Sequence, residues 1–106
     1  MIANLRADAF APLVETLCEL IPDGGFPIPV TVIEVTENPR ALPPRAPSGR
    51  RVPFSVLLTG PAESDFSSGS CTFRAKDRLT VEGLHVNRIV SLDGENDKAW
   101  YQIVFN

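Results

Sequence analysis

Hydrophobic and polar residues alternate along most of the chain, which is the pattern of half-buried β-strands. The clearest example spans residues 52–59, where one apolar set alternates with a more polar one; the apolar set is Val52, Phe54, Val56 and Leu58. Pro53 lies near the start of this strand, where its missing N–H does least damage. Gly60-Pro61 is a turn signal and ends the strand.

Further strands are predicted on both sides of this one. A β-branched run covers residues 30–35, with a change of phase at Ile33 that indicates either a β-bulge or burial on both faces. Residues 71–75 and 79–82 alternate around a turn at Lys76-Asp77. After Gly83, residues 84–90 form either the second half of that strand or a new one. Asp93-Gly94 is a hairpin signal, and residues 100–105 form a terminal strand.

One helix is predicted near the N-terminus. Phe10, Leu13, Val14 and Leu17 fall at i, i+3, i+4 and i+7. Asp8 is a plausible N-cap, because its carboxylate can accept hydrogen bonds from the free N–H groups of a first turn. Pro12 is tolerated only near a helix start. We therefore expect a short helix over about residues 8–15 and a strand that begins near Thr16.

These elements predict a mainly β fold: a small antiparallel barrel or sandwich of about six strands with one short N-terminal helix. No predicted helix is long enough to connect parallel strands. The 106 residues fit a single β domain over 1–106, and the apolar terminal strand suggests that this domain is complete. The residues expected in its core include Phe54, Val56, Leu58, Phe73 and Phe105.

Charge and hydropathy exclude several classes of function. The net charge is −3, and no predicted strand combines exposed aromatic and basic residues, so a specific nucleic-acid partner is not expected. No run of about 18 apolar residues exists, so no membrane span is predicted. The first residues lack the features of a signal peptide, which favours a cytoplasmic location.

Candidate catalytic and metal-binding residues each have a plainer structural interpretation. His85, the single histidine, has no nucleophile or carboxylate among its neighbours along the strand. Ser67, Ser68 and Ser70 have no base to activate them. Cys18 and Cys71 lack nearby ligand partners and are expected as free core thiols, with a disulfide as the less favoured alternative. Residues 93–97 carry a carboxylate at every second position, as the start of a calcium-binding loop does. The glycine and glutamate that such a loop needs at its sixth and twelfth positions are replaced by Lys98 and Val104. No catalytic residue, metal or cofactor is predicted.

The segment from Asn38 to Arg51 differs from the rest of the chain. It contains Arg40, Arg45, Arg50 and Arg51 and no acidic residue, and its four prolines favour an extended chain. We expect a long loop, residues 38–50, between two strands. Long loops are often functional, and arginines without local counter-charge suit carboxylate or phosphate groups on a partner. The alternative is a solubilising loop that pairs with the acidic body of the domain.

Three segments together resemble a family of small uncharacterised bacterial proteins. These are the strand and turn from Arg51 to Pro61, Phe10-Ala11-Pro12-Leu13-Val14, and the ending from Tyr101 to Asn106. The resemblance covers nearly the whole chain and implies no activity. Some members are encoded near phage-tail-collar-like proteins, which implies an assembly partner. The chain departs from the family pattern at Glu15, where glycine is common, and at Cys71, where an aromatic residue is common.

Three functional hypotheses follow from the sequence. The first is a non-catalytic interaction or assembly module that binds another, acidic protein through the four arginines. The second is a barrel that holds a small apolar ligand, although six strands leave little internal space. The third is an enzyme that uses dispersed residues such as Asp65, Glu82 and His85. A solid core would favour the first hypothesis, an empty apolar cavity the second, and a polar pocket the third.

Overall fold

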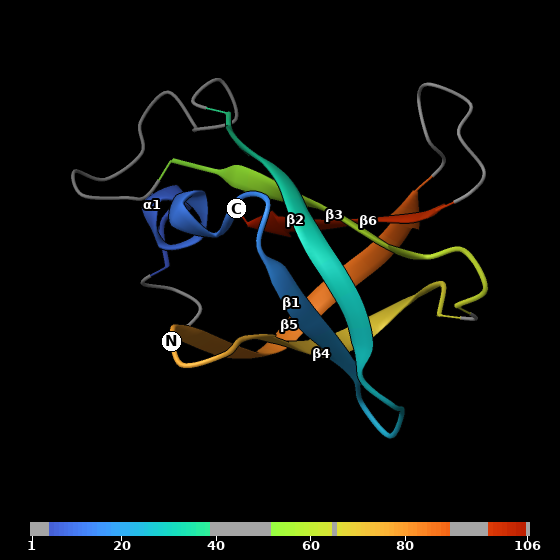
Figure 1. The fold of residues 1–106 in the computed structure, drawn as a ribbon. Coiled ribbons are helices and arrows are strands. Elements are labelled where there is room, and N and C mark those ends of the chain that lie inside the picture. The colour runs from blue at the N-terminus through green and yellow to red at the C-terminus, as the bar shows by residue number, and fades with distance from the viewer. Residues whose placement is uncertain (1–4, 39–51, 65, 90–97, 106) are drawn as a thin grey trace.

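The chain forms a closed six-stranded antiparallel β-barrel with a short helix at one end (Figure 1). The structure is a computed structural model that describes residues 5–38, 52–64, 66–89 and 98–105. The strands follow the order β1-β2-β3-β6-β5-β4 around the barrel. Their bounds are β1 Leu17–Pro22, β2 Ile28–Glu37, β3 Phe54–Pro61, β4 Ser68–Ala75, β5 Leu79–Ile89 and β6 Lys98–Phe105. The predicted mainly β fold is confirmed, and of the two predicted architectures the barrel is the correct one.

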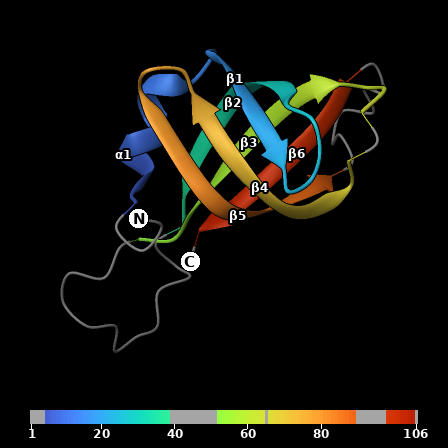
Figure 2. The same cartoon turned by 90° about the horizontal axis from the view of Figure 1, so that it is seen from below.

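Every paired strand is antiparallel, so successive connections alternate between the two ends of the barrel. We call the end that joins β1 to β2, β3 to β4 and β5 to β6 the hairpin end. The other end joins β2 to β3 and β4 to β5, and also carries the helix and the end of β6; we call it the helix end. Figure 2 shows α1 and the C-terminus together at one end and the β1–β2 turn away from them.

Two β-bulges let long strands bend around the barrel. In β2 the register with β3 shifts between Val32 and Glu34, so the change of phase at Ile33 is a bulge. In β5 the register with β4 shifts between the pairs Phe73–Val81 and Cys71–Leu84. Gly83 lies in this interval with φ 71°, a conformation that glycine adopts without strain. Residues 84–89 therefore continue the strand that begins at Leu79.

The predicted helix exists, but it is shorter than the sequence suggested. α1 spans Ala7–Phe10, and the 3-10 turn η2 spans Ala11–Leu13. Arg6, and not Asp8, occupies the N-cap position, and no side chain caps the helix. The helix ends early because the backbone turns to pair with β2: the Glu15 N–H donates to the Val32 carbonyl at 2.6 Å. Leu17, expected on the helix face, begins β1 and is 69% exposed.

The turn between η2 and β1 requires an unusual backbone conformation. Glu15 has φ 68°, a left-handed conformation that is favourable for glycine and uncommon for other residues. The same turn brings Val14 into an isolated parallel bridge with Val32.

The helix closes its end of the barrel with a phenylalanine. Phe10 is fully buried, and its ring lies 5.9 Å from Phe54, 5.4 Å from Phe73 and 5.4 Å from Phe105 between centroids. Phe54 and Phe105 stack at 4.5 Å. The core residues predicted from the strand pattern are all buried; these are Phe54, Val56, Leu58, Phe73 and Phe105. The alternating pattern thus identified the inner face of the barrel correctly.

Tyr101 fills the other half of the interior, toward the hairpin end. Its ring lies 6.0 Å from Phe66, which approaches from the β3–β4 connection. Gly60 is close to it, since a Cβ at that position would meet Tyr101 Cε2 at 3.3 Å and the Pro29 carbonyl oxygen at 3.1 Å. The Tyr101 hydroxyl is buried and has no hydrogen-bond partner among the described residues. In the parts of the chain that are described, no helix is long and apolar enough to cross a membrane.

Candidate functional site

The four arginines that the sequence singled out, Arg40, Arg45, Arg50 and Arg51, lie outside the described residues. The residues on either side of them are described and lie at the helix end. The Asn38 N–H donates to the Pro53 carbonyl at 2.7 Å, which holds the end of β2 beside the start of β3. The arginine-rich segment therefore leaves the barrel and returns to it at neighbouring points, and two surface pockets lie at these points.

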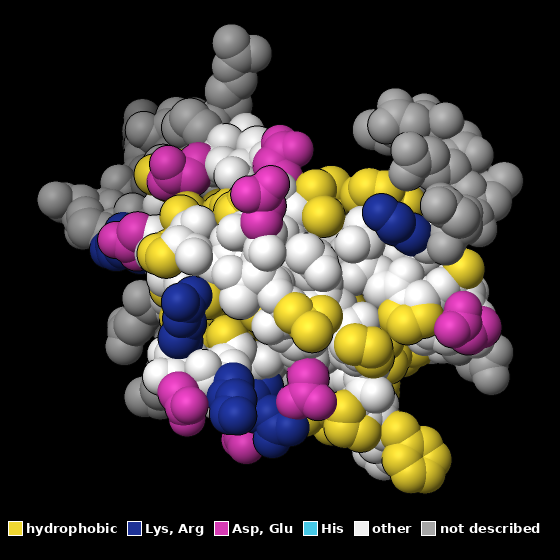
Figure 3. All heavy atoms as spheres, in the orientation of Figure 1, with side chains coloured by type: hydrophobic (Ala, Val, Ile, Leu, Met, Phe, Trp, Pro, Cys, Tyr) yellow, Lys and Arg dark blue, Asp and Glu magenta, His cyan; other side chains and the backbone are white. Residues whose placement is uncertain are grey.

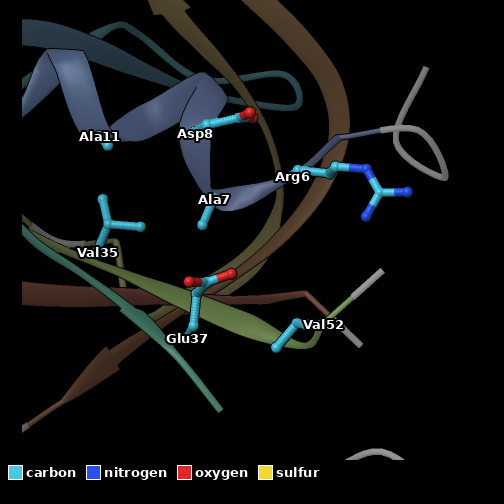
Figure 4. A pocket seen from close by; sticks show the side chains of 7 residues that line it. All are labelled: Arg6, Ala7, Asp8, Ala11, Val35, Glu37 and Val52. Carbon is cyan, nitrogen blue, oxygen red and sulfur yellow. The ribbon is translucent and has the colours of Figure 1, made fainter. Parts of the chain in front are cut away.

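The first pocket lies between the helix and the end of β2, with a volume of about 360 Å³ (Figure 4). Four small apolar side chains form its wall: Ala7, Ala11, Val35 and Val52. Asp8 of α1 and Glu37 of β2 place carboxylates on opposite sides of its mouth, while Arg6 extends away from them (Figure 4). We call this the charged pocket. Its chemistry suits a positively charged side chain with an apolar stem better than it suits an anion.

The second pocket has a volume of about 230 Å³ and lies where β3 begins and β6 ends. Pro53, Phe54, Val104 and Phe105 supply its apolar surface, and Asn38, Ser55 and Gln102 supply neutral polar groups. We call this the uncharged pocket. Val104 is 53% exposed although it is apolar. The described residues that line this pocket carry no charge.

The topology separates the charges of the connecting segments between the two ends of the barrel. The connections of the hairpin end contain six acidic residues and no lysine or arginine: Asp23, Glu63, Asp65, Asp93, Glu95 and Asp97. The connections of the helix end contain six basic residues and one acidic residue, Asp77; the basic ones are Arg40, Arg45, Arg50, Arg51, Lys76 and Arg78. The described residues outside these connections mix the charges again: Asp8 and Glu37 lie at the helix end, and Arg88 and Lys98 lie at the hairpin end.

The two buried thiols each lie near one charged residue, and the two charges have opposite signs. Burial, together with the smaller effect of the negative charge of Asp23 at the hairpin end, raises the pKa of Cys71 to about 11. Burial also raises the pKa of Cys18, but the positive charge of Arg78 at the helix end opposes this shift. Both cysteines are free and buried, as the sequence predicted. Thiols with raised pKa values are poor nucleophiles at neutral pH.

His85 lies on the outer face of β5 and is exposed. Its cross-strand partner in β4 is Ser70, a neighbour that the sequence alone did not reveal. The Ser70 carbonyl accepts a hydrogen bond from the Asp23 N–H at 3.0 Å. Across the neighbouring strands, Ser70 therefore lies between Asp23 and His85. A catalytic triad needs the histidine between the other two residues, so that the carboxylate can orient it, and this order does not provide that arrangement.

The remaining candidates for chemistry do not form a site within the described residues. Glu82 is exposed beside the bulge of β5, while Asp65 and the acidic run at 93–97 lie outside the described residues. The described parts of the chain contain no group of three or more histidine, cysteine, aspartate or glutamate residues that could hold a metal ion. Among the described residues, the dispersed enzyme candidates therefore form no catalytic arrangement.

Phe26 is the exposed residue that sequence reasoning missed. It lies in the β1–β2 turn at the hairpin end and is 89% exposed. The turn that carries it is anchored, because the Gly25 N–H donates to the Pro22 carbonyl at 2.9 Å and the Asp23 N–H bonds to β4. In Figure 3, hydrophobic side chains gather over the part of the face where Figure 1 places this hairpin. The signal in the sequence was an aromatic residue between Gly25 and Pro27. It lies outside any alternating run, so burial in a strand does not explain it.

Comparison with known proteins assigns the chain to a family. Residues 5–105 match the domain of unknown function DUF6916, and the chain belongs to this family. No curated protein matches the chain, and no solved structure does either. The family assignment covers the whole barrel and the helix, and it agrees with the resemblance to an uncharacterised family.

Proposed function

We propose that this barrel is a non-catalytic protein-interaction or assembly module that binds an acidic partner protein at its helix end. The observation that carries the proposal is the position of the described residues that flank the arginine-rich segment. Its flanking residues line both surface pockets: Val52 lines the charged pocket, and Asn38 and Pro53 line the uncharged one. Basic residues beside an apolar recess form the combination in which charge steers a partner and apolar contact holds it.

The packing of the interior supports an interaction surface on the outside of the barrel. The rings of Phe10, Phe54, Phe73 and Phe105 fill the helix end in mutual contact, and Tyr101 and Phe66 occupy the other half. Six-stranded barrels of this kind leave little room once their side chains are placed. This packing counts against the alternative function, the storage of a small apolar ligand inside the barrel.

The setting that we propose follows from the sequence resemblance. The partner would be an assembly protein related to phage-tail-like structures, and the module would act in the cytoplasm of a bacterium. No cofactor is part of the proposal. The enzyme alternative would require Glu82, His85 and Asp65 to act together, and the cross-strand order of Asp23, Ser70 and His85 gives it no support.

The test is a fourfold substitution of Arg40, Arg45, Arg50 and Arg51 by serine. The parent and the variant are each immobilised, and proteins captured from a cell lysate are compared at low and moderate salt. We expect the parent to capture a partner more strongly at low salt, and the variant to capture less of it with a flatter salt dependence. The thermal unfolding curves should nearly coincide, because exposed loop charges contribute little to stability.

A control substitutes exposed charges that lie on the barrel wall, outside the arginine-rich segment. Arg74 and Glu19 form an exposed ion pair on the barrel wall, in which Arg74 Nε donates to Glu19 Oε1 at 3.0 Å. Changing both to serine should leave capture unchanged. Equal recovery of the partner by the parent and the fourfold variant at both salt concentrations would refute the role of the arginines.

A further inference from the structure

The charged pocket combines an apolar wall with two carboxylates, and we infer that it binds a lysine side chain of the partner protein. The inference rests on the proposed interaction function and deepens it: the otherwise acidic partner places one lysine in the charged pocket. This contact uses residues of α1, β2 and the start of the chain's return to β3, and none of the four arginines, so the two contacts can be tested apart.

The first argument is the recess itself, which makes more of this place than two neighbouring carboxylates. The pocket has a volume of about 360 Å³, and Ala7, Ala11, Val35 and Val52 form its wall. Ala7 and Val35 are half-buried and pack against the core, so this part of the wall is fixed. A lysine side chain has an apolar stem that gains free energy from contact with such a wall while its charged end stays at the mouth.

The second argument is the charge at the mouth. Asp8 and Glu37 place carboxylates on its opposite sides (Figure 4), and neither carboxylate forms an ion pair or a hydrogen bond with another described residue. Arg6 also lines the pocket, but its side chain extends away from both carboxylates (Figure 4). Two negative charges against one positive charge leave the lining with a net negative charge, so the mouth attracts a cation and repels an anion.

The third argument distinguishes lysine from arginine. A lysine ammonium is a compact charge with three donors, so it can donate to carboxylates on two sides of it. A guanidinium is a planar fork that pairs best with both oxygens of one carboxylate. Because the two carboxylates come from different elements, α1 and β2, and lie on opposite sides of the mouth, the arrangement favours lysine (Figure 4).

Both carboxylates are carried by elements that the core holds in place. Phe10 fixes α1 through its buried ring, and Glu37 is paired with Phe54 of β3. The two sides of the pocket are therefore positioned before a lysine enters, which lowers the ordering cost of binding.

The experiment compares two acidic peptides that differ at one position. One peptide has a central lysine between alanine and glutamate residues, and the other has norleucine there, which keeps the apolar stem and lacks the ammonium group. Each peptide is titrated into the isotopically labelled full chain, and the NMR shifts of the Ala7 and Val35 amides report on the pocket. We expect the lysine peptide to bind roughly tenfold more tightly than the norleucine peptide, as two charge pairs at a partly exposed site would produce.

Two variants each remove one carboxylate and keep the shape of the pocket. Asp8→Asn and Glu37→Gln change exposed residues, and no side chain caps α1, so both variants should fold. Each should lower the preference for lysine over norleucine by roughly threefold. The matched control Glu82→Gln removes an exposed carboxylate of β5 outside the pocket and should keep the preference of the parent.

Several results would overturn the inference. These are equal binding of the two peptides by the parent, an unchanged lysine preference in Glu37→Gln, and tighter binding of a matching peptide with arginine at the central position. A parent that binds neither peptide would overturn it as well.

The lysine site and the role of the arginines fail in different ways. The fourfold substitution of Arg40, Arg45, Arg50 and Arg51 by serine should weaken both acidic peptides equally and leave the preference for lysine unchanged. If the fourfold variant binds both peptides as tightly as the parent does and the preference persists, the role of the arginines is rejected and the lysine site stands. If the fourfold variant binds both more weakly but the parent shows no preference, the lysine site is rejected and the interaction function stands.

Discussion

Two phenylalanines at the two ends of the barrel have opposite environments. Phe10, on the helix, is fully buried and contacts the rings of Phe54, Phe73 and Phe105. Phe26, in the β1–β2 turn, is 89% exposed. Burying an aromatic side chain stabilises the fold, whereas exposing one contributes almost nothing to it. The comparison indicates that Phe10 stabilises the barrel at the helix end, whereas Phe26 at the hairpin end contributes little to folding.

The two buried cysteines also differ in the sign of the charge near them. The positive charge of Arg78 at the helix end opposes the rise in the pKa of Cys18, while the negative charge of Asp23 at the hairpin end adds to the rise in the pKa of Cys71. The two thiols are therefore internal probes of the field at each end. Three experiments test how separate the ends are, and they follow in order of expected effect.

The largest effect is expected when β6, which spans both ends, is removed. Deleting residues 99–106 takes away Tyr101 at one end and Phe105 at the other, and it opens the barrel between β3 and β5. Losing even two large core side chains costs on the order of 6–10 kcal/mol, which is comparable to the stability of a small domain. We expect an unfolded or insoluble product by circular dichroism and solubility. A cooperative transition near the temperature of the full-length chain would contradict the central role of β6.

The second experiment compares Phe10→Ala with Phe26→Ala. We expect Phe10→Ala to lower the free energy of unfolding by about 3–5 kcal/mol, because it empties the space between three rings. Phe26→Ala should change it by less than about 0.5 kcal/mol. Urea unfolding of both variants measures the difference. Similar losses of stability for the two would mean that the β1–β2 turn is part of the folded core.

The smallest effect is expected in alkaline solution. The pKa of Cys71 rises from 9.0 to about 11 on folding, so the unfolded chain releases this proton first as the pH increases. The contribution to stability is therefore complete below about pH 9 and is lost progressively up to about pH 11. We expect the unfolding free energy of the parent to decline over this range by on the order of 1–2 kcal/mol more than that of Cys71→Ala.

Cys18→Ala is the matched control for this measurement. Because Arg78 opposes the shift at Cys18, removing that thiol should flatten the alkaline decline less than removing Cys71 does. Each variant is compared with the parent through the slope of the unfolding free energy against pH. The cavity left by alanine lowers the unfolding free energy at every pH and so does not change this slope. If Cys71→Ala and the parent decline in parallel, the thiol is not buried in the way described.

The alternating pattern predicted most of the barrel because period-two burial is a local property of a strand. Phe54, Val56 and Leu58 point inward as expected, and the change of phase at Ile33 is a bulge. The helix was overestimated for a physical reason. The i, i+3, i+4, i+7 spacing continues to Leu17, but Glu15 and Thr16 form hydrogen bonds with Val32 of β2 instead of continuing the helix. A partner strand that is distant in the sequence decided that boundary.

The candidate site was predictable only in part. The sequence identified the arginine-rich segment by its local charge, but it did not reveal the pocket formed by Asn38, Pro53 and Val104, because those residues come from three different strands or strand ends. It also left Ser70 and His85 apart, although they are cross-strand neighbours. Such contacts depend on strand order, and the side-chain pattern within one strand carries little information about which strand lies beside it.

The sequence by itself determined which residues enter strands, which of their faces is buried, and how much charge each connection carries. Hydrophobic burial and turn chemistry act on neighbouring residues, so they can be read along the chain. Only the tertiary structure decided that acidic and basic connections gather at opposite ends, and that Phe26 and the uncharged pocket lie at the two ends of β2. Closure of the barrel through the β1–β4 pairing is a long-range event, and it is this closure that gives the molecule two distinct ends.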